Sequence, residues 1–141
     1  MKRPIALAFV LSLFGCSPFL SAGSGEANLQ ETQWVATRIN GDAIKGSAPT
    51  LTIEKNHAYG NSSCNRYTGK VTLGDNNTLQ FGLIASTRMA CLGDADRQEI
   101  AYFKALQSIS SYHLNQGDLI LLDKDFNKVI EFRTMQESRP R

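Results

Sequence analysis

The feature that most limits how this chain can fold is a series of short segments in which apolar and polar residues alternate. Residues 50–54 (TLTIE) place Leu51 and Ile53 on one side, which is typical of a strand with one buried face. Turn-forming Asn, Asp and Gly residues separate the segments and favour antiparallel pairing. Further strand-like segments lie at 33–39, 58–60, 66–73, 78–81, 83–87, 112–115, 119–123 and 129–133.

One segment instead has helical periodicity and predicts a single α-helix over about 95–109. Its apolar stripe consists of Ile100, Phe103, Leu106 and Ile109. Asp96, followed three residues later by Glu99, predicts a capping box at the helix start. The fold class expected is α+β, mainly antiparallel β. Because short antiparallel strands often curl to remove their edges, we expect a small barrel-like sheet.

The N-terminal residues have the pattern of an export signal. A basic start precedes an apolar stretch at 5–14 that is too short to span a membrane. Residues 13–16 (LFGC) resemble the lipobox of bacterial lipoproteins, in which Cys16 would carry the lipid. Because Ser17 rather than Asp follows Cys16, this interpretation predicts an outer-membrane lipoprotein facing the periplasm. The alternative is ordinary cleavage near Ala22 or Gly23, which predicts a soluble periplasmic protein.

The export signal also sets the domain organisation and the charge. The expected parts are a signal peptide at 1–15 (alternatively 1–22), a tether at 16–28, one folded domain at 29–135 and a flexible tail at 136–141. The formal charge of +2 comes from Lys2 and Arg3, so the mature chain would be neutral. Net charge therefore gives no argument for nucleic acid, and we expect membrane contact through the lipid anchor only.

The three cysteines predict one disulfide. Cys16 is either acylated or removed with the signal, which leaves Cys64 and Cys91 in an oxidising compartment. One alternative is a metal site that adds His57 and His113, but the paired spacings of zinc sites are missing. A catalytic Cys–His pair is a second alternative, and it would need a stable thiolate. We therefore expect no metal and no cofactor, and both histidines on strand surfaces.

Acidic residues near the predicted helix start offer a further enzymatic hypothesis. Asp94, Asp96 and Glu99, with Arg88 and Arg97 nearby, could perform general acid–base chemistry. Acids of this kind more commonly cap a helix. Phosphate-binding loops, zinc-protease motifs and nucleophile elbows are missing from the sequence. We therefore expect a non-enzyme.

Two cysteine motifs resemble those of META domains, the family of HslJ-like heat-shock lipoproteins. Residues 63–69 (SCNRYTG) are similar to its first signature, except that Ser63 stands where glycine is usual, which could alter a local turn. Residues 87–91 (TRMAC) are similar to its second signature. The family residues matched are Asn65, Tyr67, Gly69, Thr87 and Met89. The resemblance implies a barrel-like fold with one helix, the bacterial envelope, and stress response including heat shock and novobiocin resistance, without an established catalytic activity.

Most motif residues are predicted to have structural roles. Asn65 can hydrogen-bond backbone groups or occupy a left-handed turn, Gly69 can let strands approach, and Met89 can fill a gap in the core. The function expected is binding of an envelope protein or small ligand during stress. Two kinds of ligand are consistent with the sequence: an apolar ligand in the barrel mouth or an extended peptide on a strand edge. The alternatives are a structural accessory of an envelope complex and a periplasmic enzyme.

Overall fold

The computed structural model describes residues 27–135. Cys16, both predicted cleavage positions, most of the predicted tether and the predicted tail lie outside the described residues. Within them, no helix is both long and apolar enough to cross a membrane.

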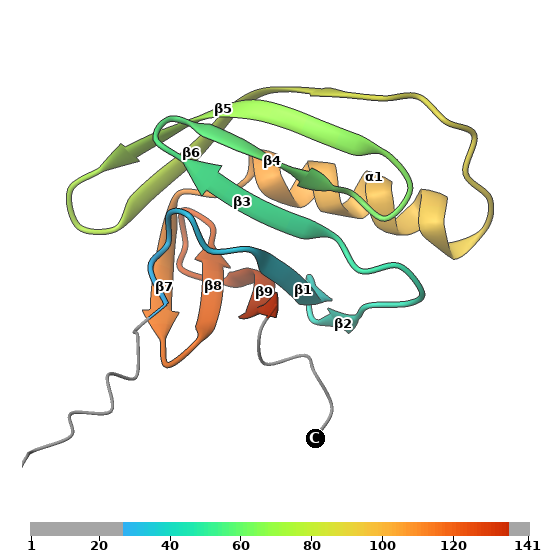
Figure 1. The fold of residues 1–141 in the computed structure, drawn as a ribbon. Coiled ribbons are helices and arrows are strands. Elements are labelled where there is room, and N and C mark those ends of the chain that lie inside the picture. Colours follow the sequence, from blue (N-terminus) through green and yellow to red (C-terminus); the bar gives the residue numbers. More distant parts are fainter. Residues whose placement is uncertain (1–26, 136–141) are drawn as a thin grey trace, which may run out of the picture.

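Nine strands and one helix make up the described part of the chain (Figure 1). In chain order they are β1 (Trp34–Ile39), β2 (Asp42–Ala43), β3 (Thr50–Glu54), β4 (His57–Asn61), β5 (Arg66–Gly74), β6 (Thr78–Ser86), α1 (Asp94–Gln107), β7 (Ser111–Asn115), β8 (Asp118–Leu122) and β9 (Lys128–Thr134). The predicted α+β class with a single helix is confirmed for these residues.

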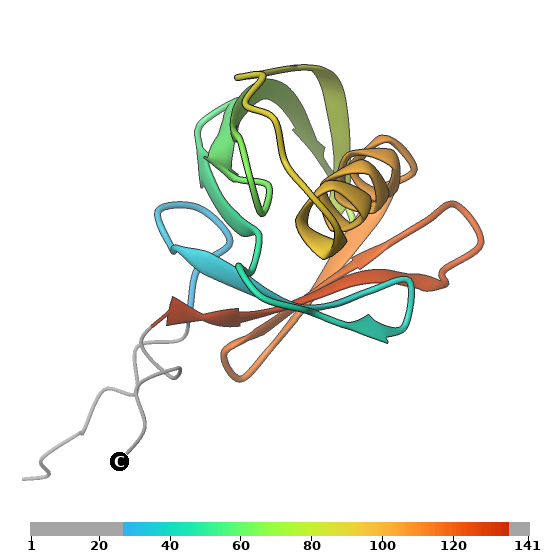
Figure 2. The same cartoon turned by 90° about the vertical axis from the view of Figure 1, so that its right-hand side faces the viewer.

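The strands form one antiparallel sheet that closes into a ring. The strand order is β2-β1-β3-β4-β5-β6-β7-β8-β9, and β1 also pairs with β9. Figure 2 shows how the sheet curves around the helix. Closure removes most free sheet edges, which is the physical reason for expecting a curled sheet.

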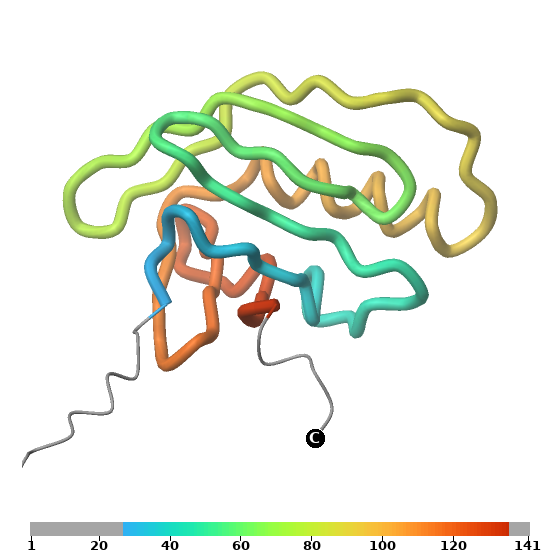
Figure 3. Tube along the Cα trace, viewed as in Figure 1, coloured from blue at the N-terminus to red at the C-terminus, as the bar shows by residue number. Residues whose placement is uncertain are grey.

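The ring is weakest between β6 and β7, and α1 lies there. These strands share one residue pair, Thr78 with Ser111. Two backbone bonds flank it, from Leu79 N–H to the Ser110 carbonyl at 3.1 Å and from Tyr112 N–H to the Asn77 carbonyl at 3.0 Å. Gln107 at the end of α1 donates from Nε2 to the Gly82 carbonyl at 3.1 Å. The continuous Cα trace in Figure 3 shows the connection from β6 returning to the start of α1. The helix thus covers the side of the ring where strand pairing is sparse.

The inner face of the ring and one side of α1 form the core. Leu51 and Ile53 are fully buried, which confirms the alternation predicted for 50–54. The pattern of 66–73 is also confirmed, since Tyr67 and Val71 are buried. The other large side chains with almost no exposure are Trp34, Leu79, Tyr102, Leu106, Leu119, Leu121, Ile130 and Phe132. Apolar burial of this extent is the main stabilising contribution to the fold.

Three local predictions were wrong. Residues 78–81 and 83–87 were expected as separate segments, but β6 runs through both, because a register shift opposite Gly69–Val71 keeps it paired with β5. The capping box is also absent: Gly93 precedes the helix, no side chain caps it, and Glu99 bonds elsewhere. The buried helix face is centred on Tyr102, Ala105 and Leu106, which leaves Ile100 of the predicted stripe exposed.

Candidate functional site

The two motif cysteines form a disulfide that ties the turn before β5 to the segment before α1. Cys64 and Cys91 have Cα atoms 6.1 Å apart, and the predicted pairing is present in the structure. They are separated by 27 residues in the sequence. In the chain-entropy model, a loop of this size contributes about 3.5 kcal/mol by restricting the unfolded chain. The disulfide therefore anchors both motifs to each other.

Glu99 of α1 is bound by the turn at residues 62–65. Its Oε2 accepts the backbone N–H of Asn65 at 2.9 Å and the hydroxyl of Ser62, and its Oε1 accepts the Asn65 side-chain amide at 2.8 Å. Burial alone would raise the pKa of Glu99, but the hydrogen bonds from Ser62 and Asn65 outweigh it and hold the pKa below its usual value. The carboxylate is therefore an acceptor that joins the helix to the turn.

Asn65 also binds the second motif. Its Oδ1 accepts the Thr87 hydroxyl at 2.9 Å and the Met89 backbone N–H at 2.7 Å. Thr87 Oγ1 in turn accepts the Arg66 backbone N–H at 3.1 Å. The prediction that Asn65 bonds backbone groups is confirmed. We call Ser62, Asn65, Thr87 and Glu99, with the disulfide, the motif network.

Met89 does not fill the core as predicted. Its side chain is 62% exposed, because its backbone is held by Asn65 while the chain runs along the surface toward α1. Gly69 does allow close approach, as predicted. A Cβ there would lie only 3.0 Å from the Leu83 carbonyl oxygen on β6, at the point where the register shifts.

Ser63 lies in the region of backbone conformation that favours glycine. Its φ is 103°, and its hydroxyl donates to the Ser47 carbonyl at 2.8 Å. Gln98 of α1 donates to the same hydroxyl at 2.5 Å and accepts the Lys45 backbone N–H at 2.8 Å. Gln98 and Ser62 were missed by the sequence analysis, since nothing in their spacing indicates a partner more than 30 residues away.

A buried tyrosine pair lies beneath the motif network. The hydroxyls of Tyr67 and Tyr102 are 2.7 Å apart, and Tyr67 donates to the Thr50 carbonyl at 2.8 Å. Burial raises the pKa of both phenols, so both stay neutral near physiological pH. The ring of Tyr67 also contacts Phe103 edge-on, with centroids 5.7 Å apart. We assign this motif tyrosine to the core.

The acids of the enzymatic hypothesis do not converge. Asp94 forms an exposed pair with Arg97 at 2.7 Å, which lowers the pKa of the Asp94 carboxyl. Glu99 turns away from this pair toward Asn65. The Asp96 side chain is exposed and has no hydrogen bond or ion pair in the described part of the chain. The three carboxyls therefore do not share one site.

The metal and Cys–His hypotheses are not supported by the geometry either. His57 on β4 and His113 on β7 are exposed strand residues, as predicted. Within residues 27–135, one group of potential metal ligands comes together, namely Cys64, Cys91 and Glu99. The two sulfurs are bonded to each other and Glu99 is occupied by hydrogen bonds, so the group offers no thiolate ligand.

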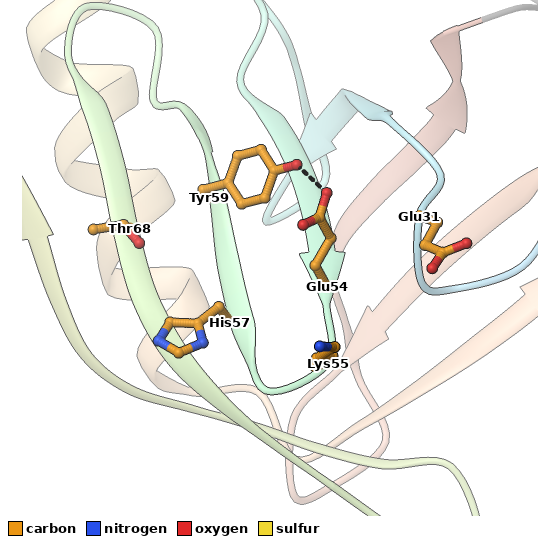
Figure 4. Close-up of a pocket in the computed structure, with 6 residues that line it drawn as sticks. All are labelled: Glu31, Glu54, Lys55, His57, Tyr59 and Thr68. Atoms are coloured by element: carbon orange, nitrogen blue, oxygen red, sulfur yellow. Dashed lines mark hydrogen bonds between the residues drawn. The ribbon is translucent and has the colours of Figure 1, made fainter.

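A polar hollow of about 770 Å³ lies on the outer side of β3, β4 and β5 (Figure 4). It is lined by Glu31, Glu54, Lys55, His57, Tyr59 and Thr68. The Tyr59 hydroxyl donates to Glu54 Oε1 at 2.5 Å, and this bond to a carboxylate raises the pKa of the exposed phenol. Sequence analysis missed the hollow, although Glu54, Tyr59 and Thr68 lie in predicted strands; Glu31 and Lys55 lie outside the predicted strands.

The described residues form a small domain: one antiparallel sheet closed into a ring, one helix, and a disulfide between the two cysteine motifs. The family model for the META domain matches residues 27–136, and the chain belongs to the META domain family. No curated protein matches the chain.

Two solution structures have the same fold. One, a protein from Burkholderia xenovorans, is 27% identical with a TM-score of 0.62, and the match covers 98% of this chain and 99% of that one. The other is 21% identical, also with a TM-score of 0.62, and covers 79% of this chain and 95% of its own. This second likeness bears on the fold alone.

Proposed function

We propose that this protein is a non-enzymatic, lipid-anchored protein of the bacterial envelope that binds a ligand or partner during stress. The observation that carries the proposal is the META match over residues 27–136, which supports an HslJ-like envelope protein. Heat shock and novobiocin are the stresses that the HslJ-like resemblance implies. The disulfide between Cys64 and Cys91 suits an oxidising compartment and adds support.

Support for a non-enzymatic role comes from the ionisable groups. Glu99, the most enclosed acid of the predicted cluster, receives all its hydrogen bonds from structural partners. Asp94 is neutralised by Arg97 at the surface. General acid–base catalysis needs an acid and a base on either side of one substrate position. The positions of Glu99 and Asp94 do not provide such a pair.

Growth under stress tests the physiological role. A deletion strain should grow less well than its parent after heat shock or in novobiocin, and the full chain supplied in trans should restore growth. A deletion strain indistinguishable from its parent under both conditions would contradict the proposed role.

Lipid attachment is tested separately. The lipobox-like residues 13–16 support acylation of Cys16, and a diacylated N-terminus gives stable membrane anchoring. Labelled palmitate should be incorporated into the protein, processing should be blocked by globomycin, and Cys16→Ala should abolish the label. A soluble protein that begins near Gly23 would refute the anchor and favour the soluble periplasmic alternative.

A structural accessory of an envelope complex is the second candidate. The observation that favours it is exposed apolar surface at Leu83 and Leu92, which are 93% and 90% exposed. Exposed apolar side chains mark interaction surfaces when they form patches. Crosslinking the native protein in cells, followed by purification, distinguishes the candidates. A stoichiometric protein partner would favour the accessory role, and recovery of the uncrosslinked chain would favour solitary ligand binding.

A further inference from the structure

The outer hollow on β3, β4 and β5 combines an aromatic ring with closely spaced polar groups. We infer that it binds a neutral saccharide, with one sugar ring stacked on Tyr59. The inference rests on the proposed binding role and names its ligand class.

Tyr59 provides the flat surface that a sugar ring needs. Its side chain is 41% exposed, and its hydroxyl is held by Glu54 at 2.5 Å. Figure 4 shows the Tyr59 ring between Thr68 and Glu54, with its hydroxyl pointing toward the carboxylate. An aromatic side chain fixed at its polar end presents an apolar face at low entropic cost. The C–H face of a pyranose packs against such a surface.

Strand register surrounds the ring with hydrogen-bonding groups. Thr52 of β3 and Thr68 of β5 are the direct neighbours of Tyr59 on either side. Glu54 is opposite His57 in the adjacent row. Threonine hydroxyls donate and accept, and a carboxylate accepts. Sugar hydroxyls likewise donate and accept, so the hollow complements several of them at once.

The wall of the hollow is fixed by hydrogen bonds from two backbone N–H groups. Glu31 N–H donates to the Ile53 carbonyl at 2.9 Å, and Lys55 N–H donates to Gln30 Oε1 at 3.0 Å. Both bonds hold the segment that carries Glu31 against β3. Ligand sites are usually formed before the ligand arrives, and this hollow meets that condition.

The lining residues also decide between ligand classes. None of the six lining side chains is aliphatic, which disfavours an apolar ligand in this hollow. Two carboxylates, Glu31 and Glu54, outnumber the one lysine, Lys55, so an acidic sugar would be repelled. A neutral sugar satisfies the polar groups without adding charge.

Binding can be tested with the full chain on a printed array of neutral and acidic glycans. Titration with N-acetylglucosamine tetramer, followed by ¹⁵N NMR, would then locate the site. We expect neutral glycans to bind, and the amide signals of residues 57–59 and 68 to shift. Tyr59→Ala should weaken binding about tenfold or more, as expected for loss of an aromatic contact. Phe126→Ala is the matched control, because Phe126 is an exposed aromatic outside the hollow.

The outcomes separate this inference from the proposed function. Absence of binding to every neutral glycan, preference for acidic glycans, or unchanged binding by Tyr59→Ala would overturn the saccharide site. The NMR spectrum reports whether Tyr59→Ala is folded. If Tyr59→Ala does not fold, Thr68→Val replaces it as the test, because this variant keeps the side-chain shape and should also weaken binding. If the deletion strain is stress-sensitive but the protein binds no glycan, the proposed envelope role stands and only the saccharide site is refuted.

Discussion

Glu99 on α1 accepts hydrogen bonds from both the backbone N–H and the side-chain amide of Asn65, which precedes it by 34 residues. Asn65 uses its other side to hold Thr87 and Met89 of the second motif. One asparagine thus joins the start of β5, the helix and the segment that carries Cys91. This relationship explains why the two cysteine motifs occur together.

Replacing Glu99 tests the motif network. Glu99→Gln puts an amide donor where the carboxylate accepts bonds from Ser62 and Asn65. Because a partly buried donor then faces other donors, we expect a loss of about 2 kcal/mol in the free energy of unfolding. Urea denaturation measures it. Asp96→Asn is the matched control, being an exposed acid on the same helix, and should change stability by less than about 0.5 kcal/mol. Equal effects in both variants would contradict a special role for Glu99.

The lowered pKa of Glu99 predicts an acid-sensitive contribution to stability. A carboxyl with a folded pKa below its unfolded value stabilises the protein fully above the unfolded value, near 4.5. That contribution is lost as the pH falls through the folded pKa. Unfolding curves between about pH 6 and about pH 3 should therefore show a smaller loss of stability for Glu99→Gln than for the unaltered chain. Parallel curves for the two proteins would show that Glu99 titrates normally.

Gly60 on β4 should not tolerate a side chain. A Cβ there would lie 2.8 Å from the carbonyl carbon of Thr50 and closer still to its oxygen, which also accepts the Tyr67 hydroxyl. Because backbone must move, Gly60→Ala should cost about 3 kcal/mol or fail to fold. Gly82→Ala on β6 is the control, since its Cβ would meet only ordinary contacts at 3.5 Å. Thermal unfolding compares them, and a stable Gly60→Ala protein would contradict this packing.

The sequence predicted the parts of the fold that depend on local patterns. Alternation at 50–54 and 66–73 identified strands and their buried faces, because the period of two is a property of the strand itself. The role of Glu99 was misassigned, since its spacing from Asp96 fits a capping box while its partners lie at residues 62–65. The hollow around Tyr59 was missed for a similar reason, because it depends on which strands become neighbours.

Ser63 gives a final test of how local strain and long-range bonds balance. Its φ of 103° favours glycine, but its hydroxyl joins Ser47 and Gln98. Ser63→Ala keeps the strain and loses both bonds, so we expect a cost of about 1–2 kcal/mol. Ser63→Gly loses the same bonds but relieves the backbone, so its net effect should be within about 1 kcal/mol of zero. Chemical denaturation should therefore rank the glycine variant above the alanine variant. The reverse order would show that the backbone at this turn is not strained by its side chain.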